Sequence, residues 1–400
     1  MIRRHWMRKA LISFLVPIIL FACAKLTQEV KVPERPLILL EGKKIPAFED
    51  DLDRESLRIA ISRSIEYFQR LPEDHVFEYG EDQYSTGYLI QSMETLLHLL
   101  DEAEDMKELT DMIRQRFNVY QSVGSDGRGG VLYTGYYEPI LEGTLTPDEN
   151  YRWPLYKRPG DLMAIDLGLF KPKFKGEKIV ARYDGSGIVP YFSREEIDSS
   201  RVLSGRELEI AWLEDPIDVF FLHIQGSGQI MLENGARLRV NYSASNGRPY
   251  RSIGGLLINQ GIITRDEMNI PRLREYLRDN PSQREEILNY NESYVFFRVV
   301  EEGPLGNIEV PLTPGRSIAT DSRLFPKGSL VYICAEKPII DDSGTIIAWV
   351  PFSRFALNQD TGGAIRGPGR VDLFWGSGEV AGIAAGQMKN EGNLYFLVEK

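Results

Sequence analysis

The sequence predicts a mainly β protein with a helical N-terminal part, an α+β fold class. Apolar residues recur with helical spacing between residues 51 and 117. Beyond the glycines near residue 127, runs rich in β-branched and aromatic residues replace that pattern. The chain also has 36 Gly and 22 Pro in 400 residues, which indicates many turns. Because one hydrophobic core rarely organises more than ~250–300 residues, we expect two globular units.

The first 23 residues predict an export signal. Arginine and lysine at positions 3, 4, 8 and 9 precede twelve mostly apolar residues, Ala10 to Phe21. This run is shorter than the ~20 residues of a transmembrane helix and is typical of a signal peptide. Leu20-Phe-Ala-Cys23 resembles a bacterial lipobox, which implies a signal peptide over 1–22 and lipidation of Cys23. The simpler alternative is an ordinary signal peptide in which Cys23 has no role.

The remaining elements follow in order. Residues 23–46 mix charge and proline and are expected to form a tether. Leu57, Ala60, Ile61, Ile65 and Phe68 predict a helix that ends before Pro72. Further helices are expected near 83–101, 105–117 and 266–290. Strands are expected at 131–139, within 153–250 (including 219–226), and at 294–300, 329–335, 346–350, 371–375 and 394–398.

Charge and composition exclude several function classes. The net charge of −11 disfavours binding to a phosphate backbone, so no nucleic-acid partner is expected. Only Cys334 accompanies Cys23, which leaves no disulfide framework and no cysteine-based metal site. His75, His98 and His223 lie far apart and lack metal-binding spacing. We therefore expect neither a metal nor a cofactor.

The segment 358–376 is the strongest candidate for chemistry. Asp360 and Asp372 bracket a loop with many glycines, and Asp372 opens the apolar run Leu373-Phe-Trp375. A carboxyl group beside large apolar side chains is partly desolvated, which raises its pKa toward that of a general acid. The alternative is that both aspartates only stabilise turns through their own backbone.

Two nearby motifs do not support other chemistries. Gly376-Ser-Gly378-Glu-Val-Ala381 matches a dinucleotide-binding fingerprint, but the chain that follows is too short for a βαβ unit. Ser227, in Gln225-Gly-Ser-Gly228, lacks the spacing of a nucleophile elbow. A dinucleotide site and a serine hydrolase are therefore disfavoured.

The ordered motifs after residue 130 resemble those of the membrane-bound lytic murein transglycosylase A family. Asp321, Asp360 and Asp372 are similar to the three aspartates that name the C-terminal 3D domain of this family. The segments that carry the resemblance are 134–139, 153–156, 224–228, 241–254, 293–297, 310–321 and 360–376.

The resemblance implies a double-psi β-barrel and an inserted second β domain, with a groove between them. The barrel domain would combine residues 47–138 with 300–400, and residues 139–299 would form the insert. Asp372 takes the position of the catalytic acid/base, Asp360 and Thr134 take neighbouring positions, and Asp321 is interpreted as mainly structural. Substrate-binding positions are expected at Tyr136, Tyr137, Gln225, Ser227, Tyr242, Arg251 and Trp375.

The activity implied by the resemblance is lytic cleavage of peptidoglycan. The β-1,4 bond between N-acetylmuramic acid and N-acetylglucosamine would break and leave a 1,6-anhydromuramoyl end. The expected partners are glycan strands and, through the lipid anchor, the membrane; proteins that build or degrade the wall are open as further partners. Ala24 after the cysteine implies the outer membrane, with the enzyme facing the periplasm.

Three alternatives stay open on the sequence. An inverting glycan hydrolase would use Asp360 as base and Asp372 as acid. A non-catalytic peptidoglycan-binding lipoprotein would need neither carboxylate, although the acidic pair on a glycine-rich loop argues against it. A metal-dependent peptidase is disfavoured by the small number of histidines.

Overall fold

The computed structural model describes residues 35–400. The expected signal peptide, Cys23 and the first part of the expected tether lie outside these residues. Within the described range, no helix combines the length and the apolar character needed to cross a bilayer.

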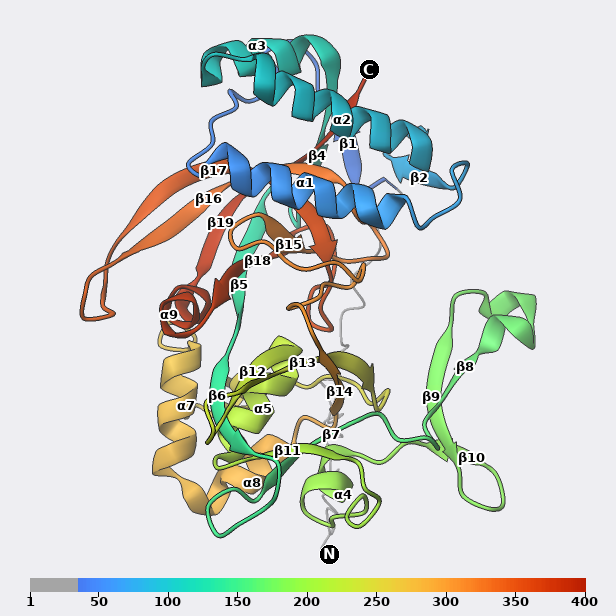
Figure 1. The fold of residues 1–400 in the computed structure, drawn as a ribbon, viewed down its shortest axis with the longest axis vertical. Coiled ribbons are helices and arrows are strands. Elements are labelled where there is room, and N and C mark those ends of the chain that lie inside the picture. Colours follow the sequence, from blue (N-terminus) through green and yellow to red (C-terminus); the bar gives the residue numbers. More distant parts are fainter. Residues whose placement is uncertain (1–34) are drawn as a thin grey trace, which may run out of the picture. The chain divides into compact units, whose positions relative to one another are not determined.

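Six strands close into a β-barrel (Figure 1). Around the ring the strands follow the order β5, β19, β16, β17, β15 and β18, and β18 pairs back onto β5. The barrel with a second β sheet and a helical N-terminal part confirms the predicted fold class. The barrel strands are β5 (Val131–Glu138), β15 (Ser317–Ala319), β16 (Leu330–Ile340), β17 (Ile346–Asp360), β18 (Arg370–Ser377) and β19 (Lys389–Glu399).

Two further strands extend the barrel sheet. β4 (Phe117–Ser122) pairs with β19, and β1 (Leu37–Leu39) pairs with β4. Residues 37–39 were expected to belong to a tether, but Leu37 is buried in the main core. This apolar contact holds the segment in the sheet. A short 3-10 helix, η1 (Gly42–Lys44), follows.

Three helices pack on the barrel and share its hydrophobic core: α1 (Arg54–Phe68), α2 (Thr86–Glu102) and α3 (Met106–Arg116). α1 begins where the Asp53 carboxylate accepts a hydrogen bond from the Ser56 amide at 2.7 Å. Its predicted apolar stripe is buried, so this helix is confirmed. α2 begins later than expected because β2 (Val76–Tyr79) and β3 (Asp82–Ser85) form a hairpin before it.

The chain between β5 and β15 forms a second, six-stranded sheet in the order β14-β13-β12-β6-β11-β7. Its own apolar cluster is separate from that of the barrel. The strands are β6 (Ile140–Thr144), β7 (Trp153–Tyr156), β11 (Glu209–Leu213), β12 (Ser227–Leu232), β13 (Arg237–Ser245) and β14 (Val295–Val300).

The expected strand over 219–226 is wrong, because this segment lies in helix α5 (Pro216–Gln225). Asp215 caps the helix by accepting from the Ile217 amide at 2.8 Å, and Gly226 ends it with φ of 80°. The run from Val219 to His223 is buried on nearly every side, which removes the helical apolar period. α5 packs with α6 (Ile253–Asn259), α7 (Ile270–Asp279) and α8 (Pro281–Asn289), and the last two confirm the helices expected at 266–290.

A three-stranded antiparallel sheet extends from the second sheet (Figure 1). It consists of β8 (Met163–Asp166), β9 (Lys178–Tyr183) and β10 (Ile188–Pro190), with the 3-10 turns η2 (Leu167–Leu169) and η3 (Pro172–Phe174) at one end. We call residues 163–190 the β8–β10 arm. The short helix α4 (Arg194–Asp198) follows it, and α9 (Glu379–Gln387) follows β18.

Candidate active site

Asp372 and Thr134 lie side by side in the barrel wall. β18 runs parallel to β5, and the register places Asp372 opposite Thr134. The Thr134 hydroxyl donates a hydrogen bond to Asp372 Oδ1. The Asp372 side chain is 21% exposed, so it is half-buried yet open to a bound molecule.

The surroundings of Asp372 favour its protonated form. Burial raises its pKa to about 6, the positive charge of Arg370 opposes that rise, and the negative charge of Asp360 adds to it. Arg370 Nη2 lies 3.6 Å from Asp372 Oδ1 and donates to Thr134 Oγ1 at 3.1 Å. A carboxyl with this pKa holds a proton in weakly acidic solution and can still release it.

Sequence reasoning missed Arg370, although a signal was present. Residues two apart on a strand face the same side of the sheet. Arg370 stands two positions before Asp372, directly before the expected strand 371–375, and in the structure it is the first residue of β18 on the same face. Strand alternation would have identified it as a charged neighbour.

Asp360 ends β17, and both oxygens of its carboxylate accept hydrogen bonds from protein donors. Its Oδ1 accepts from the amides of Asn307 at 2.9 Å and Thr361 at 2.8 Å. Its Oδ2 accepts from the Tyr136 hydroxyl at 2.9 Å. Burial raises the pKa of Asp360, and these hydrogen bonds oppose the rise. Asp360 is thereby arranged to orient Tyr136.

Lys327 lies beside the backbone of Asp360, and the sequence analysis did not predict it as a residue of the site. Its side chain is buried, and Nζ donates to the Asp360 carbonyl oxygen and, at 3.1 Å, to Asn358 Oδ1. Burial lowers the pKa of Lys327 to about 7. The isolated lysine in the apolar run Leu324-Phe-Pro-Lys327 is the sequence signal that could have found it, since buried lysines need polar partners.

Asp321 is buried and holds the glycine-rich loop. It accepts from Arg323 Nη2 at 2.6 Å and from the Gly367 amide at 2.8 Å. Burial alone would raise the pKa of Asp321, but the hydrogen bonds and the charge of Arg323 outweigh it and lower the value to about 2. This geometry agrees with the structural interpretation of Asp321.

The residues expected to bind substrate lie in several different parts of the structure. Tyr136 contacts Asp360, and the Tyr137 amide donates to Gln225 Oε1 at 3.0 Å. Ser227 is buried at the start of β12, whereas Tyr242 on β13 is 46% exposed. Tyr250, in the segment after β13, lies near Asp372: burial raises its pKa, and the charge of Asp372 adds to the rise.

Trp375 and Arg251 have other neighbours. Trp375 is three residues from Asp372 and so faces the opposite side of β18. A Cβ on Gly135 would lie 2.7 Å from both the Trp375 ring and Ala385 of α9, so the indole packs between this strand and helix. The structure does not bring Trp375 to the carboxylate. Arg251 forms an ion pair with Glu292 at 2.8 Å.

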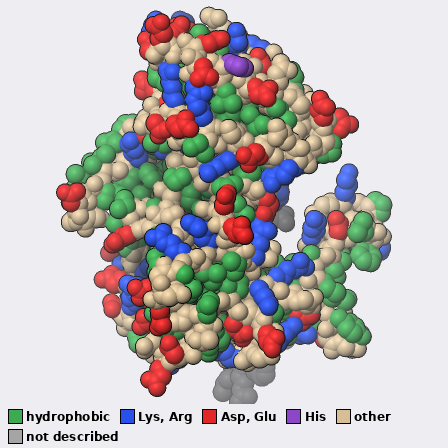
Figure 2. Space-filling model, in the orientation of Figure 1, with side chains coloured by type: hydrophobic (Ala, Val, Ile, Leu, Met, Phe, Trp, Pro, Cys, Tyr) green, Lys and Arg blue, Asp and Glu red, His purple; other side chains and the backbone are tan. Residues whose placement is uncertain are grey.

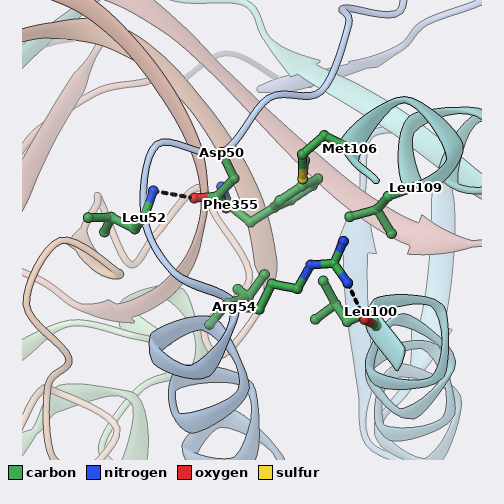
Figure 3. A pocket seen from close by; sticks show the side chains of 8 residues that line it. Asp50, Leu52, Arg54, Leu100, Met106, Leu109 and Phe355 are labelled. Carbon is green, nitrogen blue, oxygen red and sulfur yellow. Dashed lines mark hydrogen bonds between the residues drawn. The ribbon is translucent and has the colours of Figure 1, made fainter. Parts of the chain in front are cut away.

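Two cavities in the structure lie away from Asp360 and Asp372. One of about 20 Å³, room for roughly one water, lies between α1, α2, α3 and β17 (Figure 3). The other, about 550 Å³, is lined by residues of β6, β7 and α5, including Trp153 and Asp218. Neither is lined by Asp360 or Asp372. Among residues 35–400, no group of three or more His, Cys, Asp or Glu side chains is placed to hold a metal ion.

Comparison with known proteins places this geometry in context. Residues 132–298 match the MltA specific insert domain, and residues 316–398 match the 3D domain. The chain is 30% identical to the membrane-bound lytic murein transglycosylase A of Vibrio cholerae, over 68% of this chain and 67% of the relative. It is 31% identical to the Escherichia coli protein of that name, over 70% and 69%. The crystal structure of a membrane-bound lytic murein transglycosylase from Agrobacterium tumefaciens matches with a TM-score of 0.73 and 30% identity, covering 91% of this chain and 97% of that one.

Proposed function

The chain belongs to the membrane-bound lytic murein transglycosylase A family, and on this basis we propose that it cleaves the glycan strands of peptidoglycan with Asp372 as the single acid/base. The bond cleaved is the β-1,4 linkage between N-acetylmuramic acid and N-acetylglucosamine. The observation that carries the proposal is a half-buried carboxyl with a pKa of about 6, held by Thr134.

In the first half of the reaction, Asp372 acts as the acid. Its proton moves to the glycosidic oxygen as the bond from that oxygen to C1 of N-acetylmuramic acid breaks. The N-acetylglucosamine side leaves as an alcohol. The raised pKa of Asp372 favours this step because the carboxyl must arrive protonated.

In the second half, the same side chain acts as the base. The C6 hydroxyl of the N-acetylmuramic acid attacks its own C1, and the Asp372 carboxylate takes the hydroxyl proton. A 1,6-anhydro ring forms, and Asp372 regains its proton. Because the nucleophile belongs to the substrate, the step gains a high effective molarity and needs no second protein carboxylate.

The hydrogen bonds of Asp360 favour this scheme over an inverting hydrolase. A hydrolase of that class needs a second carboxylate that is free to activate water. Both oxygens of Asp360 already accept hydrogen bonds, from Asn307, Thr361 and Tyr136. Asp360 and Thr134 therefore act as positioning residues in this proposal.

We propose that the substrate lies between the barrel and the second sheet, with the domain division expected from the sequence (47–138 and 300–400, with 139–299 inserted). The position of Tyr250 near Asp372 supports this, because it brings a residue of the inserted segment to the acid. Tyr136, Tyr137, Gln225 and Tyr242 are proposed to contact the strand. The signal sequence supports a lipid anchor at Cys23 and a location at the periplasmic face of the outer membrane.

Digestion of purified sacculi followed by mass spectrometry of the released fragments tests the proposal. Wild-type protein should release fragments with 1,6-anhydromuramoyl ends. Asp372→Asn should lose at least ~10²–10⁴-fold in rate, since it can neither give nor take the proton. Asp342→Asn, an exposed residue in the turn between β16 and β17, is the matched control and should act like wild type. Reducing muramic ends in the wild-type digest would instead identify a hydrolase.

A further inference from the structure

The β8–β10 arm has an unusual concentration of exposed apolar side chains. Of the 20 exposed large hydrophobic residues in the described chain, five lie between residues 169 and 188. Leu169, which ends η2, and Phe170, which follows it, are 85% and 73% exposed. Figure 2 shows hydrophobic and basic side chains gathered on the projecting arm. Such a concentration on a soluble surface marks an interaction site.

The apolar residues of the strands share one face of the arm. Ile179 and Tyr183 are four positions apart on β9, and Ile188 pairs with Tyr183. The alternate residues, Val180 and Arg182, face the other side. Val180 packs against Gly247, and the Arg182 guanidinium lies 4.1 Å from the centre of the Phe192 ring. The base of the arm is therefore anchored through the face of Val180 and Arg182. On the other face, Ile179 and Tyr183 stay 43% and 61% exposed, whereas Ala181 between them is buried.

Basic side chains surround the apolar tip. Lysines at positions 171, 173, 175 and 178 are all exposed and, together with Arg182, outnumber the acids of the arm, which are Asp166, Glu177 and Asp184. The chain as a whole has a net charge of −11. The tip is thus a local positive region on an acidic protein, and an anionic surface would attract it while repelling most of the remaining surface.

We propose that the tip of the β8–β10 arm docks on an anionic phospholipid bilayer, with Leu169 and Phe170 entering the interface and the lysines contacting the headgroups. A bilayer has an apolar phase directly beneath negatively charged headgroups. It therefore matches both the apolar and the basic side chains of the tip. Glycan strands offer no apolar phase, and the acidic chain is unsuited to nucleic acid. Docking would fix the orientation of the protein at the membrane, and it does not depend on the catalytic proposal.

Vesicle flotation tests this inference. The protein is the chain from residue 23 onward with Cys23→Ser, so that no acyl group forms. The probes are vesicles of phosphatidylethanolamine with phosphatidylglycerol, and vesicles of phosphatidylcholine alone. Leu169→Ser combined with Phe170→Ser should weaken partitioning onto the anionic vesicles by about tenfold or more, because the apolar contribution is lost. Lys171→Glu with Lys173→Glu should weaken it similarly.

The control variant combines Leu145→Ser with Ile347→Ser, which removes two hydrophobic residues of similar exposure outside the arm, and it should float like the parent chain. Thermal unfolding confirms that each variant is folded. The inference is overturned if the parent chain does not float, if it floats equally on neutral vesicles, or if the tip variants float unchanged. Loss of binding to purified sacculi with unchanged flotation would assign the tip to the wall instead, and would also overturn it. Lytic activity on soluble glycan fragments should persist in the tip variants, which separates this result from a failure of the catalytic proposal.

Discussion

At the scale of single residues, the proposed role of Asp372 as the acid makes its pKa set the pH range of the reaction. The carboxyl donates its proton only when protonated, so kcat/KM should fall as pH rises through about 6, approaching tenfold per pH unit. Arg370 stabilises the charged form from 3.6 Å. Arg370→Gln should therefore move this fall to higher pH by about one unit.

Arg366→Gln is the matched control for this shift. Arg366 lies in the loop that precedes β18 and donates to the backbone carbonyl of Ile365, without an ion pair to Asp372. Its pH–rate profile should overlay that of wild type. The assignment of Asp372 as the acid fails if the Arg370 variant keeps the wild-type profile.

The raised pKa of Asp372 also predicts a stability cost. A carboxyl whose pKa is higher in the folded than in the unfolded chain destabilises the fold once it ionises. The cost is absent below the unfolded value near 4, grows as pH rises, and is complete above about pH 6. Asp372→Asn removes it and should raise the free energy of unfolding by about 3 kcal/mol in mildly basic solution. Urea unfolding at several pH values measures this gain. A gain that persists below about pH 4 would show that ionisation of Asp372 is not its cause.

At the scale of elements, an arginine at the start of α1 caps the C-terminal end of α2. Arg54 Nη1 donates to the carbonyl oxygens of Leu100 at 2.8 Å and Ala103 at 2.9 Å (Figure 3 shows the first of these). The last carbonyls of a helix have no partner within it, and a cation there also favours the helix dipole. Arg54→Ala should cost about 1–2 kcal/mol in the free energy of unfolding.

Arg58, one turn further along α1, provides the comparison for Arg54. It pairs with the exposed Asp101 carboxylate, and surface ion pairs contribute ~0–1 kcal/mol. Arg58→Ala should leave the urea midpoint close to wild type. Equal losses for the two variants would show that the carbonyl contacts of Arg54 have no special value.

Strand β5 contributes both to the proposed active site and to the packing of the barrel. Thr134 and Tyr136 point toward the two aspartates, whereas Gly135 lies against Trp375 and α9. The alternation of a strand separates these roles by single positions. Chemistry on one face and close packing on the other therefore depend on the same register.

At the scale of the whole molecule, Glu138 joins the barrel to the second sheet. It is buried, and its Oε2 accepts from Gln229 Nε2 of β12 and from Ser377 Oγ of β18, both at 2.6 Å. Glu138→Ala leaves the buried Gln229 amide without its acceptor, while the exposed Ser377 hydroxyl can bond to water, so the change should cost about 1–3 kcal/mol in stability. Looser placement of the second sheet should raise KM for glycan strands. The pH at which kcat/KM falls should not change, because it depends on the pKa of Asp372.

Glu142→Ala is the control for this joint, since Glu142 lies on β6 but is exposed. Thermal unfolding and steady-state kinetics on glycan strands should be unchanged in this variant. A Glu138 variant with wild-type KM would show that the contact serves stability alone.

Local patterns in the amino-acid sequence were enough to predict several elements and the candidate acid. Helix α1 followed from its apolar period and from Pro72 after it, and the strand at Asp372 followed from the run Leu373-Phe-Trp375. The order of the motifs along the chain pointed to the family. These features depend on neighbours in the chain, so no knowledge of distant contacts is needed to predict them.

Contacts between distant parts of the chain depended on the tertiary structure alone. The barrel closes when β5 pairs with strands from the last third of the chain, which brings Thr134 to Asp372 across 238 positions. Residues 216–225 form a helix whose apolar side chains are buried by distant segments. Leu37 is buried in the same way, in a strand that pairs with β4. The tertiary fold also brings the Lys327 ammonium to the backbone carbonyl of Asp360 and packs the Trp375 ring against α9. Desolvation and charge act through space, so the proton affinity of Asp372 is a property of the assembled fold.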